Sequence, residues 1–309
     1  VPQGSVLGPI LFVLFINDLV DCFKNLAVST KLFADDLKLY TSYGLTDSSC
    51  DLTEALHRVT VWAKKWQLTI NSTKCNVLRI VNPRCKNKSD IVYDLNGSSL
   101  KVLSVVKDLG VAVDKNLRFD NHISSVVHKS LQRANLILKC FQSRDRSLLM
   151  KAFKVYVRPL LEYATPVWSP HFMYLILKIE HVQRSFTKRL FGLKNLTYID
   201  RLKQLEIDTL EHRRLIYDLC TCFKIIHGYN DTCLDMNRMH LEGRPNNTRG
   251  HNLKLAKEMC RTDMLRFFFC NRICTVWNSL PLDVVNAPSV NSFKKRVSKF
   301  NLDRFLTLK

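Results

Sequence analysis

Residues 32–40 read LFADDLKLY and place two aspartates side by side in an apolar stretch with the composition of a β-strand. Adjacent carboxylates repel each other, and a buried pair is unfavourable unless a cation lies between them. The pattern of residues 29–40 predicts two short strands joined at Ala34, Asp35 and Asp36 in a tight hairpin. A tight turn can direct two successive carboxylates toward one place, whereas a straight strand sends them to opposite faces.

Such a carboxylate turn has a specific chemical use. Aspartate oxygens suit Mg²⁺, which keeps several water ligands and usually also binds substrate phosphates. Two such ions about 4 Å apart activate an attacking hydroxyl and stabilise the leaving oxygen in phosphoryl transfer. However, an aromatic-x-Asp-Asp motif occurs by chance in about one chain in twenty of this length. By itself the motif is weak, and a solvated hairpin turn is then the better interpretation.

The composition adds a second indication. The 309 residues include 47 Lys and Arg against 27 Asp and Glu, a formal net charge of +20, and 46% are hydrophobic. This excess favours a polyanionic partner, nucleic acid before an anionic membrane, over a merely basic surface.

The apolar run VLGPILFVLFI (residues 6–16) is interrupted by Gly and Pro and is too short to span a bilayer. The 11 cysteines lack framework spacing, which predicts reduced thiols and an intracellular location, nuclear or cytoplasmic.

A glycine-bearing loop precedes the carboxylate turn by about thirty residues. Gly4, Gly8 and Pro9 mark a loop that becomes a helix, and Pro9 suits the first helical position. Residues 10–23 are apolar nearly all round, so this helix is predicted to be buried. Backbone N–H groups of such a loop, with the helix N-terminus, can accept a phosphate or a closely approaching nucleotide.

The remaining pattern predicts an α+β fold. An amphipathic helix is expected near residues 51–66, and strands at 68–70, 74–81, 91–95 and 103–113, with a turn at Asn96-Gly97. After Asp120, helix-period segments dominate, beginning with a stripe that runs from Ile123 to Phe141. The sequence therefore predicts mixed structure with a helix and antiparallel hairpins, followed by an all-helical remainder.

Several segments together resemble the reverse transcriptases of non-LTR retrotransposons of the jockey and CR1 kind. PQGSVLGPILFVLFINDL (2–19) and LFADDLKLY resemble the polymerase palm, and WQLTINSTKCNVLRI (66–80) resembles its next motif. VVKDLGVAVDKNLRFDNHI (105–123) resembles the primer-grip hairpin and the entry to the thumb. RPLLEYATPVWSP (158–170) and the segment 276–297 resemble regions downstream of the polymerase core. The resemblance implies a partial palm with primer grip at 1–117, a helical thumb at 118–192 and a helical C-terminal region at 193–309.

The resemblance also implies roles near the catalytic turn. Asp35 corresponds to the metal-binding aspartate, and Asp36 to its less directly ligating partner. Phe33 stands where an aromatic ring packs near the primer end, although a plain core position fits it equally well. Lys74 resembles a lysine that protonates the departing pyrophosphate, and a solvated surface lysine is the alternative. Cys75 stands where the family often has threonine.

Other implied contacts lie on loops and on the thumb. Pro2, Gln3 and Gly4 resemble the loop that touches nucleotide and template, and Leu109 and Gly110 resemble the turn that holds the primer strand. The basic face with Lys129 and Arg133 is a candidate for gripping duplex phosphates, or else a solvated helix face.

Two tryptophans and several cysteines have simpler interpretations. Trp62 and Trp66, at helical spacing, fit a core better than a base-stacking platform. Residue types that bind zinc occur at Cys220, Cys222, His227, Cys233, His240, Cys260, Cys270 and Cys274. Their spacing does not fit a compact zinc site, so buried thiols are favoured.

The expected function is Mg²⁺-dependent, RNA-directed DNA synthesis with an RNA template, a DNA primer at nicked target DNA, and deoxynucleotides. The resemblance implies that a third carboxylate, the fingers and an endonuclease of the kind such elements usually carry lie upstream in the same polyprotein. Asp18 and Asp21 should point away from the turn and are not candidates for this carboxylate. The chain is therefore expected to be a fragment that is inactive, or nearly so, alone. The alternatives are a non-catalytic nucleic-acid-binding remnant and a protein-interaction module.

Overall fold

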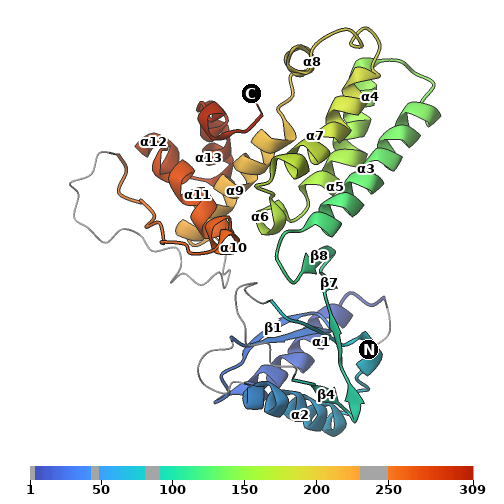
Figure 1. The fold of residues 1–309 in the computed structure, drawn as a ribbon, viewed down its shortest axis with the longest axis vertical. Coiled ribbons are helices and arrows are strands. Elements are labelled where there is room, and N and C mark those ends of the chain that lie inside the picture. Colours follow the sequence, from blue (N-terminus) through green and yellow to red (C-terminus); the bar gives the residue numbers. More distant parts are fainter. Residues whose placement is uncertain (1–3, 43–48, 81–90, 230–249, 309) are drawn as a thin grey trace. The chain divides into compact units, whose positions relative to one another are not determined.

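The computed structural model describes residues 4–42, 49–80, 91–229 and 250–308. The chain divides into two compact units, Val1–Val106 and Lys107–Lys309, called here the N-terminal and C-terminal units (Figure 1). The first unit carries small sheets, and the chain is mostly helical after residue 120, which confirms the mixed α+β class. The domain boundaries near residues 117 and 192 stay predictions. No helix within the described ranges is both long and apolar enough to cross a membrane.

The N-terminal unit combines two-stranded sheets with helices. Its elements are α1 (Gly8–Ile16), the 3₁₀ segment η1 (Asn17–Phe23), β1 (Ser29–Phe33), β2 (Asp36–Tyr40), α2 (Ser49–Lys65), η2 (Ser72–Lys74), β3 (Asn76–Leu78), β4 (Asp94–Leu95), β5 (Ser98–Ser99) and β6 (Lys101–Leu103). β1–β2 and β4–β5 are antiparallel hairpins, but β3 pairs with β6 in parallel. The prediction of antiparallel hairpins alone was therefore wrong for β3. Residues 68–70, predicted as a strand, are not in one.

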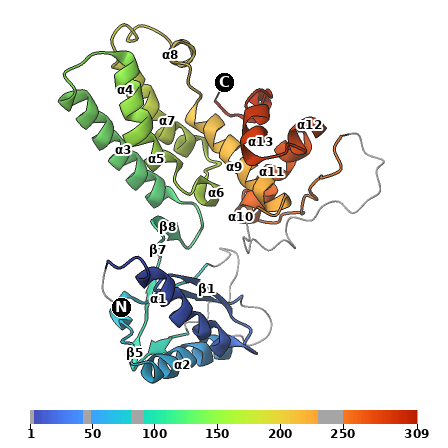
Figure 2. The ribbon, with the colours of Figure 1, turned by 180° about the vertical axis from the view of Figure 1, so that it is seen from behind.

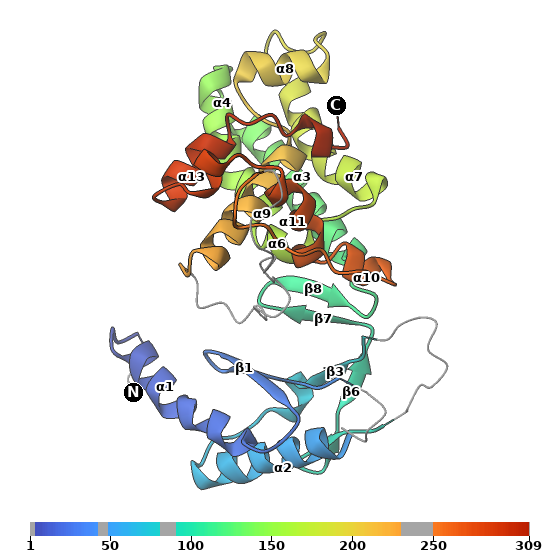
Figure 3. The same cartoon turned by 90° about the vertical axis from the view of Figure 1, so that its left-hand side faces the viewer.

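The core of this unit lies between α2, η1 and the β1–β2 hairpin (Figure 3). Ala55, Val59 and Trp62 recur at helical spacing and bury one face of α2. Leu19 and Phe23 of η1 join them, and alternate hairpin residues pack on the same cluster: Leu32, Leu37 and Leu39. The hairpin thus has one face against the core, which fixes its register.

Helix α1 differs from its prediction. It was expected to be buried, yet Ile16 is its only buried residue. Val13 and Leu14 are 54% and 69% exposed, whereas Phe12 and Phe15 pack partly against the core. The reason is that GPILFVLFI is apolar on every side, so its pattern cannot say which side finds a partner. Within the described residues, only one side of α1 is covered.

The C-terminal unit begins with a hairpin and continues as helices (Figure 2). Its elements are β7 (Val105–Asp108), β8 (Val111–Asp114), α3 (Asp120–Cys140), α4 (Arg146–Ala152), the π-helical segment η3 (Phe153–Val157), α5 (Arg158–Glu162), α6 (Thr165–Trp168), α7 (Met173–Lys188), α8 (Tyr198–Leu205), α9 (Leu210–Ile226), α10 (Asp263–Arg266), α11 (Phe269–Asn278), α12 (Leu282–Val285), α13 (Val290–Val297) and the 3₁₀ turn η5 (Asp303–Phe305). β7 includes the last two residues of the first unit and pairs with β8.

Two apolar cores build this unit. One is formed mainly by α3, α4, η3, α5 and α7, and the other by α9 and α11 to α13. Helix α9 joins them, because Leu210 belongs to the first core and Leu219 to the second. The predicted stripe on α3 is confirmed, since Ile123, Val127 and Ala134 are buried.

Buried polar contacts fix how these helices meet. The Glu180 carboxylate on α7 accepts hydrogen bonds from the backbone N–H of Leu210, at 3.1 and 3.0 Å, and from the Tyr198 hydroxyl. Arg272 on α11 donates to both carboxylate oxygens of Asp218 on α9, at 2.9 and 3.0 Å. The same guanidinium donates to the Pro166 carbonyl at 2.7 Å. These contacts join helices that are distant in the sequence.

Candidate active site

The carboxylate turn is a two-residue hairpin loop. Phe33 pairs with Asp36 in the β1–β2 register, so Ala34 and Asp35 form the loop and Asp36 begins β2. Ala34 has φ 51°, and Asp35 does not have a positive φ, which is the pattern of a type II′ turn. That position favours glycine, and an alanine there carries backbone strain of about 1 kcal/mol. Strain at a non-glycine turn residue is typical of functional sites.

Both carboxylates face solvent. Asp35 and Asp36 are exposed, while Leu32 and Leu37, their neighbours, pack toward the core. The repulsion between the two aspartates is therefore relieved by water rather than by a buried cation. Phe33 is 62% exposed, which disfavours the plain core interpretation, and in the strand register it is the partner of Asp36.

The neighbouring acidic residues are committed elsewhere. Asp18 accepts a hydrogen bond from the Trp62 indole N–H at 3.1 Å, and Asp21 forms an exposed ion pair with Lys24 at 2.9 Å. Trp62 is buried, as predicted, whereas Trp66 is 39% exposed. Within the described ranges, no group of three or more His, Cys, Asp or Glu could hold a metal ion. Asp35 and Asp36 fit Mg²⁺ in ligand type and exposure, but they supply only part of a full ligand set.

The loop before α1 is described only in part. Pro2 and Gln3 lie outside the described residues. Gly4 is exposed with φ 87°, and a Cβ added there would meet no atom within 4 Å. The Ser5 hydroxyl accepts a hydrogen bond from the Gly8 N–H at 3.0 Å, which satisfies one of the open donors at the start of α1.

Lys74 ends a short, well-defined turn. Asn71 caps η2 by accepting a hydrogen bond from the Thr73 N–H at 3.1 Å, and the Lys74 N–H donates to the Asn71 carbonyl at 3.1 Å. The Lys74 side chain is exposed, so both the catalytic and the solvated interpretations stay open.

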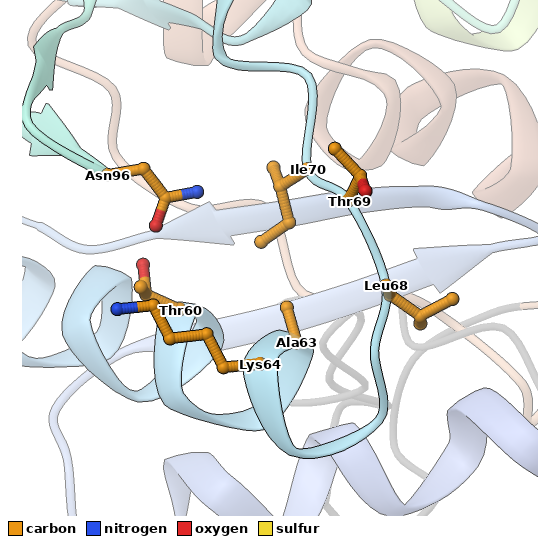
Figure 4. Close-up of a pocket in the computed structure, with 7 residues that line it drawn as sticks. All are labelled: Thr60, Ala63, Lys64, Leu68, Thr69, Ile70 and Asn96. Carbon is orange, nitrogen blue, oxygen red and sulfur yellow. The ribbon is translucent and has the colours of Figure 1, made fainter.

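One pocket of the N-terminal unit lies between α2 and the loop that follows it (Figure 4). Its lining residues are Thr60, Ala63, Lys64, Leu68, Thr69, Ile70 and Asn96. None of these is a predicted site residue, and none carries a carboxylate. The pocket is therefore separate from the candidate chemistry.

The predicted primer-grip turn is the loop between β7 and β8. Leu109 and Gly110 have φ 43° and 86°, the two positive values of a type I′ turn. The sequence prediction expected Gly110 to allow a close backbone approach. In the structure the close neighbour is the Tyr163 ring, whose Cε1 would lie 3.4 Å from an added Cβ.

The basic face of α3 is exposed. Lys129 and Arg133 both face solvent, and Arg133 also donates to the Tyr156 carbonyl at 3.2 Å. That carbonyl belongs to the π-helical segment, where the usual helical pattern of acceptors is interrupted. Sequence reasoning missed Tyr163, an exposed residue that directly follows α5 and that only ordinary helical spacing marks.

Four of the cysteines with zinc-ligand chemistry lie among apolar side chains. Cys220, Cys222, Cys270 and Cys274 are buried in the apolar core of the C-terminal unit. Burial raises the pKa of the Cys222 thiol well above its usual value, and the nearby Cys270 and Cys274 raise it further. In this core these cysteines pack as small apolar groups. Cys233 and His240 lie outside the described residues.

Comparison with known proteins identifies the lineage. Residues 1–115 match the family described as reverse transcriptase (RNA-dependent DNA polymerase). The RNA-directed DNA polymerase from the mobile element jockey of Drosophila funebris is 31% identical over 203 residues, which is 62% of this chain and 22% of that protein. A probable RNA-directed DNA polymerase from transposon BS of Drosophila melanogaster is 31% identical over 186 residues, covering 55% and 20%.

An uncharacterized protein of Caenorhabditis elegans is 32% identical over 126 residues, covering 40% of this chain and 64% of that protein. No solved structure matches. The chain thus spans less than two thirds of these relatives, and about a fifth of the two mobile-element polymerases. It is related to the reverse transcriptases of non-LTR retrotransposons and covers part of their length.

Proposed function

Because the chain is a relative of reverse transcriptases, we propose that it contributes part of the palm, the primer grip and the thumb of an RNA-directed DNA polymerase. The observation that carries the proposal is the β1–β2 turn. Two adjacent, exposed carboxylates stand on a strained loop whose strands are anchored in the core. This turn lies within the segment that matches the reverse transcriptase family.

The proposed chemistry assigns one task to each residue type. Asp35 is the principal metal ligand, and Asp36 is its partner. Mg²⁺ bound there would activate the primer 3′-hydroxyl and neutralise charge on the nucleotide phosphates. Phe33 borders the primer end, and Lys74 supplies a proton to the departing pyrophosphate. The substrates are an RNA template, a DNA primer at nicked target DNA, and deoxynucleotides, which implies that the reaction takes place where genomic DNA is accessible.

A complete site needs more ligands than these two carboxylates provide. Since the described residues hold no group of three or more ligating side chains, we propose that a further carboxylate comes from the preceding part of the same polyprotein. The 309-residue chain alone should then extend a primer at less than about a hundredth of the rate of the joined polyprotein, because one absent catalytic group costs roughly two decades or more.

Primer extension on an RNA template tests the proposal. In the joined polyprotein, Asp35→Asn should reduce the rate at least a hundredfold, because the amide keeps the shape but loses the charge that holds Mg²⁺. Asp94→Asn is the matched control, since Asp94 is an exposed aspartate beside another hairpin turn. Equal activity of the Asp35→Asn and Asp94→Asn variants would contradict the proposed role of the turn.

Nucleic-acid binding without catalysis is the second candidate, favoured by the net charge of +20. It predicts binding of RNA or DNA that weakens steeply with salt and does not change in Asp35→Asn. The same variant therefore separates the two candidates. Loss of DNA synthesis in Asp35→Asn supports the polymerase. A wild-type polyprotein that synthesises no DNA, together with equal nucleic-acid binding by wild type and Asp35→Asn, supports the second candidate.

A further inference from the structure

The β7–β8 turn is held in an unusual conformation by a side chain distant in the sequence. Leu109 has φ 43°, a left-handed value that a branched residue rarely adopts. The Tyr163 hydroxyl donates a hydrogen bond to the Leu109 carbonyl at 2.9 Å. The Tyr163 ring also lies against Gly110, where an added Cβ would approach Cε1 at 3.4 Å. One tyrosine therefore contacts both residues of the turn.

The backbone of Tyr163 is itself held in place by a buried residue. Tyr163 is the C-terminal cap of α5, and the next residue, Ala164, has φ 53°, so the chain turns sharply there. The Trp168 indole N–H donates to the Tyr163 carbonyl at 2.8 Å, and Trp168 is 1% exposed. A buried anchor thus holds the backbone of an exposed tyrosine, whose ring extends to the hairpin.

A second contact attaches β8 to the same anchor. The Ala112 N–H donates to His122 Nδ1 at 3.2 Å, and the His122 ring packs edge-on against Trp168 with centroids 5.2 Å apart. His122, Tyr163 and Trp168 are called here the hairpin clamp. It connects the turn and the second strand of the hairpin to one buried residue in the helical unit.

We propose that Tyr163 is a positioning residue of the polymerase: it sets the Leu109–Gly110 turn so that the turn can support the primer strand. The inference rests on the proposed function, since it takes the primer as the ligand of this turn. Tyr163 and Leu109 are 57% and 39% exposed, so their contact buries little and contributes little to global stability. Its consequence is the position of the turn.

The test compares Tyr163→Phe with Tyr156→Phe in the 309-residue chain. Phenylalanine keeps the ring and removes only the hydroxyl. Tyr156 is a suitable control because it is similarly exposed, at 56%, and its hydroxyl makes no hydrogen bond within the described part of the chain. Each variant is measured by thermal unfolding, by amide hydrogen exchange of residues 105–114, and by affinity for an RNA template with and without an annealed DNA primer.

Tyr163→Phe should speed exchange in the hairpin about fivefold, the usual consequence of losing one hydrogen bond. It should weaken binding of the primed template about three- to tenfold and leave binding of unprimed RNA and the Tm unchanged. Tyr156→Phe should change none of these.

Unchanged hairpin exchange in Tyr163→Phe would overturn the inference, and so would faster exchange with unchanged affinity for the primed template. Equal loss of affinity for primed and unprimed RNA, with a lower Tm, would show a structural role and also overturn it. If the wild-type chain binds primed and unprimed template with equal affinity, that result contradicts the assignment of this turn to the primer before any variant is compared.

Discussion

The two units of this chain differ in how completely their helices are packed and in which contacts hold them. In the N-terminal unit, helix α1 leaves most of its apolar residues in solvent, and Leu14 is 69% exposed. In the C-terminal unit, two closed cores are joined by buried polar contacts. All of the buried polar and charged side chains in the described ranges belong to this second unit. Apolar packing alone thus leaves the arrangement of α1 underdetermined, whereas hydrogen-bonded groups specify how the later helices meet.

The two units nevertheless share one backbone feature. Each has a hairpin turn with a non-glycine residue in the left-handed region, Ala34 in the first and Leu109 in the second. Leu109 receives a hydrogen bond from Tyr163, while the turn at Ala34 leaves two carboxylates free to face solvent. In the C-terminal unit a tertiary hydrogen bond stabilises the strained turn, whereas in the N-terminal unit the strained turn carries the two candidate metal-binding carboxylates.

The largest expected effect concerns Glu180. Replacing it with alanine leaves the Leu210 N–H and the Tyr198 hydroxyl without this acceptor, and it removes a negative charge near the buried Arg214. The C-terminal unit should therefore lose about 3–5 kcal/mol of unfolding free energy. Denaturant unfolding measures this loss. Asp263→Ala, which removes an exposed ion pair with Arg266, should cost less than about 1 kcal/mol. A comparable shift of the N-terminal transition would show that the units unfold together.

The N-terminal unit should respond to position rather than to apolarity. Leu19 is 3% exposed, so Leu19→Ala should cost about 2–5 kcal/mol. Leu14 is 69% exposed, so Leu14→Lys should change stability by less than about 0.5 kcal/mol and increase solubility. Both are measured by urea unfolding. A large loss in Leu14→Lys would mean that α1 is covered in solution.

The two units should also differ in their response to acid. Burial lowers the pKa of His122, and also those of His171 and His251, all in the C-terminal unit. A folded pKa below the unfolded value of about 6.5 means that the unfolded chain binds more protons, so stability is full above pH 6.5 and is lost as pH falls. The loss should be on the order of 1 kcal/mol per pH unit.

Unfolding measured between pH 7 and pH 5 tests this expectation. Glu180 acts in the opposite direction, because burial raises its pKa. The informative quantity is therefore the difference between wild type and His122→Gln, whose side-chain carbonyl can still accept the Ala112 N–H. Identical pH dependence in the two proteins would contradict the contribution of His122.

The smallest effect concerns the carboxylate turn. Ala34→Gly relieves the left-handed strain at φ 51°, partly offset by the entropy of glycine in the unfolded chain, and should stabilise the N-terminal unit by up to about 1 kcal/mol. Ala63→Gly, in the interior of α2, should instead destabilise it by about 1 kcal/mol or more. Thermal unfolding distinguishes the two, and equal destabilisation would mean that Ala34 is not strained in solution.

Much of this fold could be predicted where the residue pattern has a single period. The stripe of α3, the β1–β2 hairpin and the Asn96-Gly97 turn all follow from spacing or turn chemistry, and all are present. The exposure of α1 could not be predicted, because a helix that is apolar on every side has no preferred face. The parallel pairing of β3 with β6 also escaped prediction, since it joins strands separated by another hairpin.

The features of the candidate site also divide into those that the sequence predicts and those that it does not. The sequence by itself determined the adjacent carboxylates, the basic composition and the order of motifs, because these are properties of residues and their spacing along the chain. Only the tertiary structure decided that Phe33 faces solvent, that Asp18 is engaged by Trp62, and that Tyr163 reaches Leu109. Tyr163 and Leu109 are 54 residues apart, and their contact depends on how α5 ends above the buried Trp168. No local pattern encodes such a distance, which arises only when the helices pack.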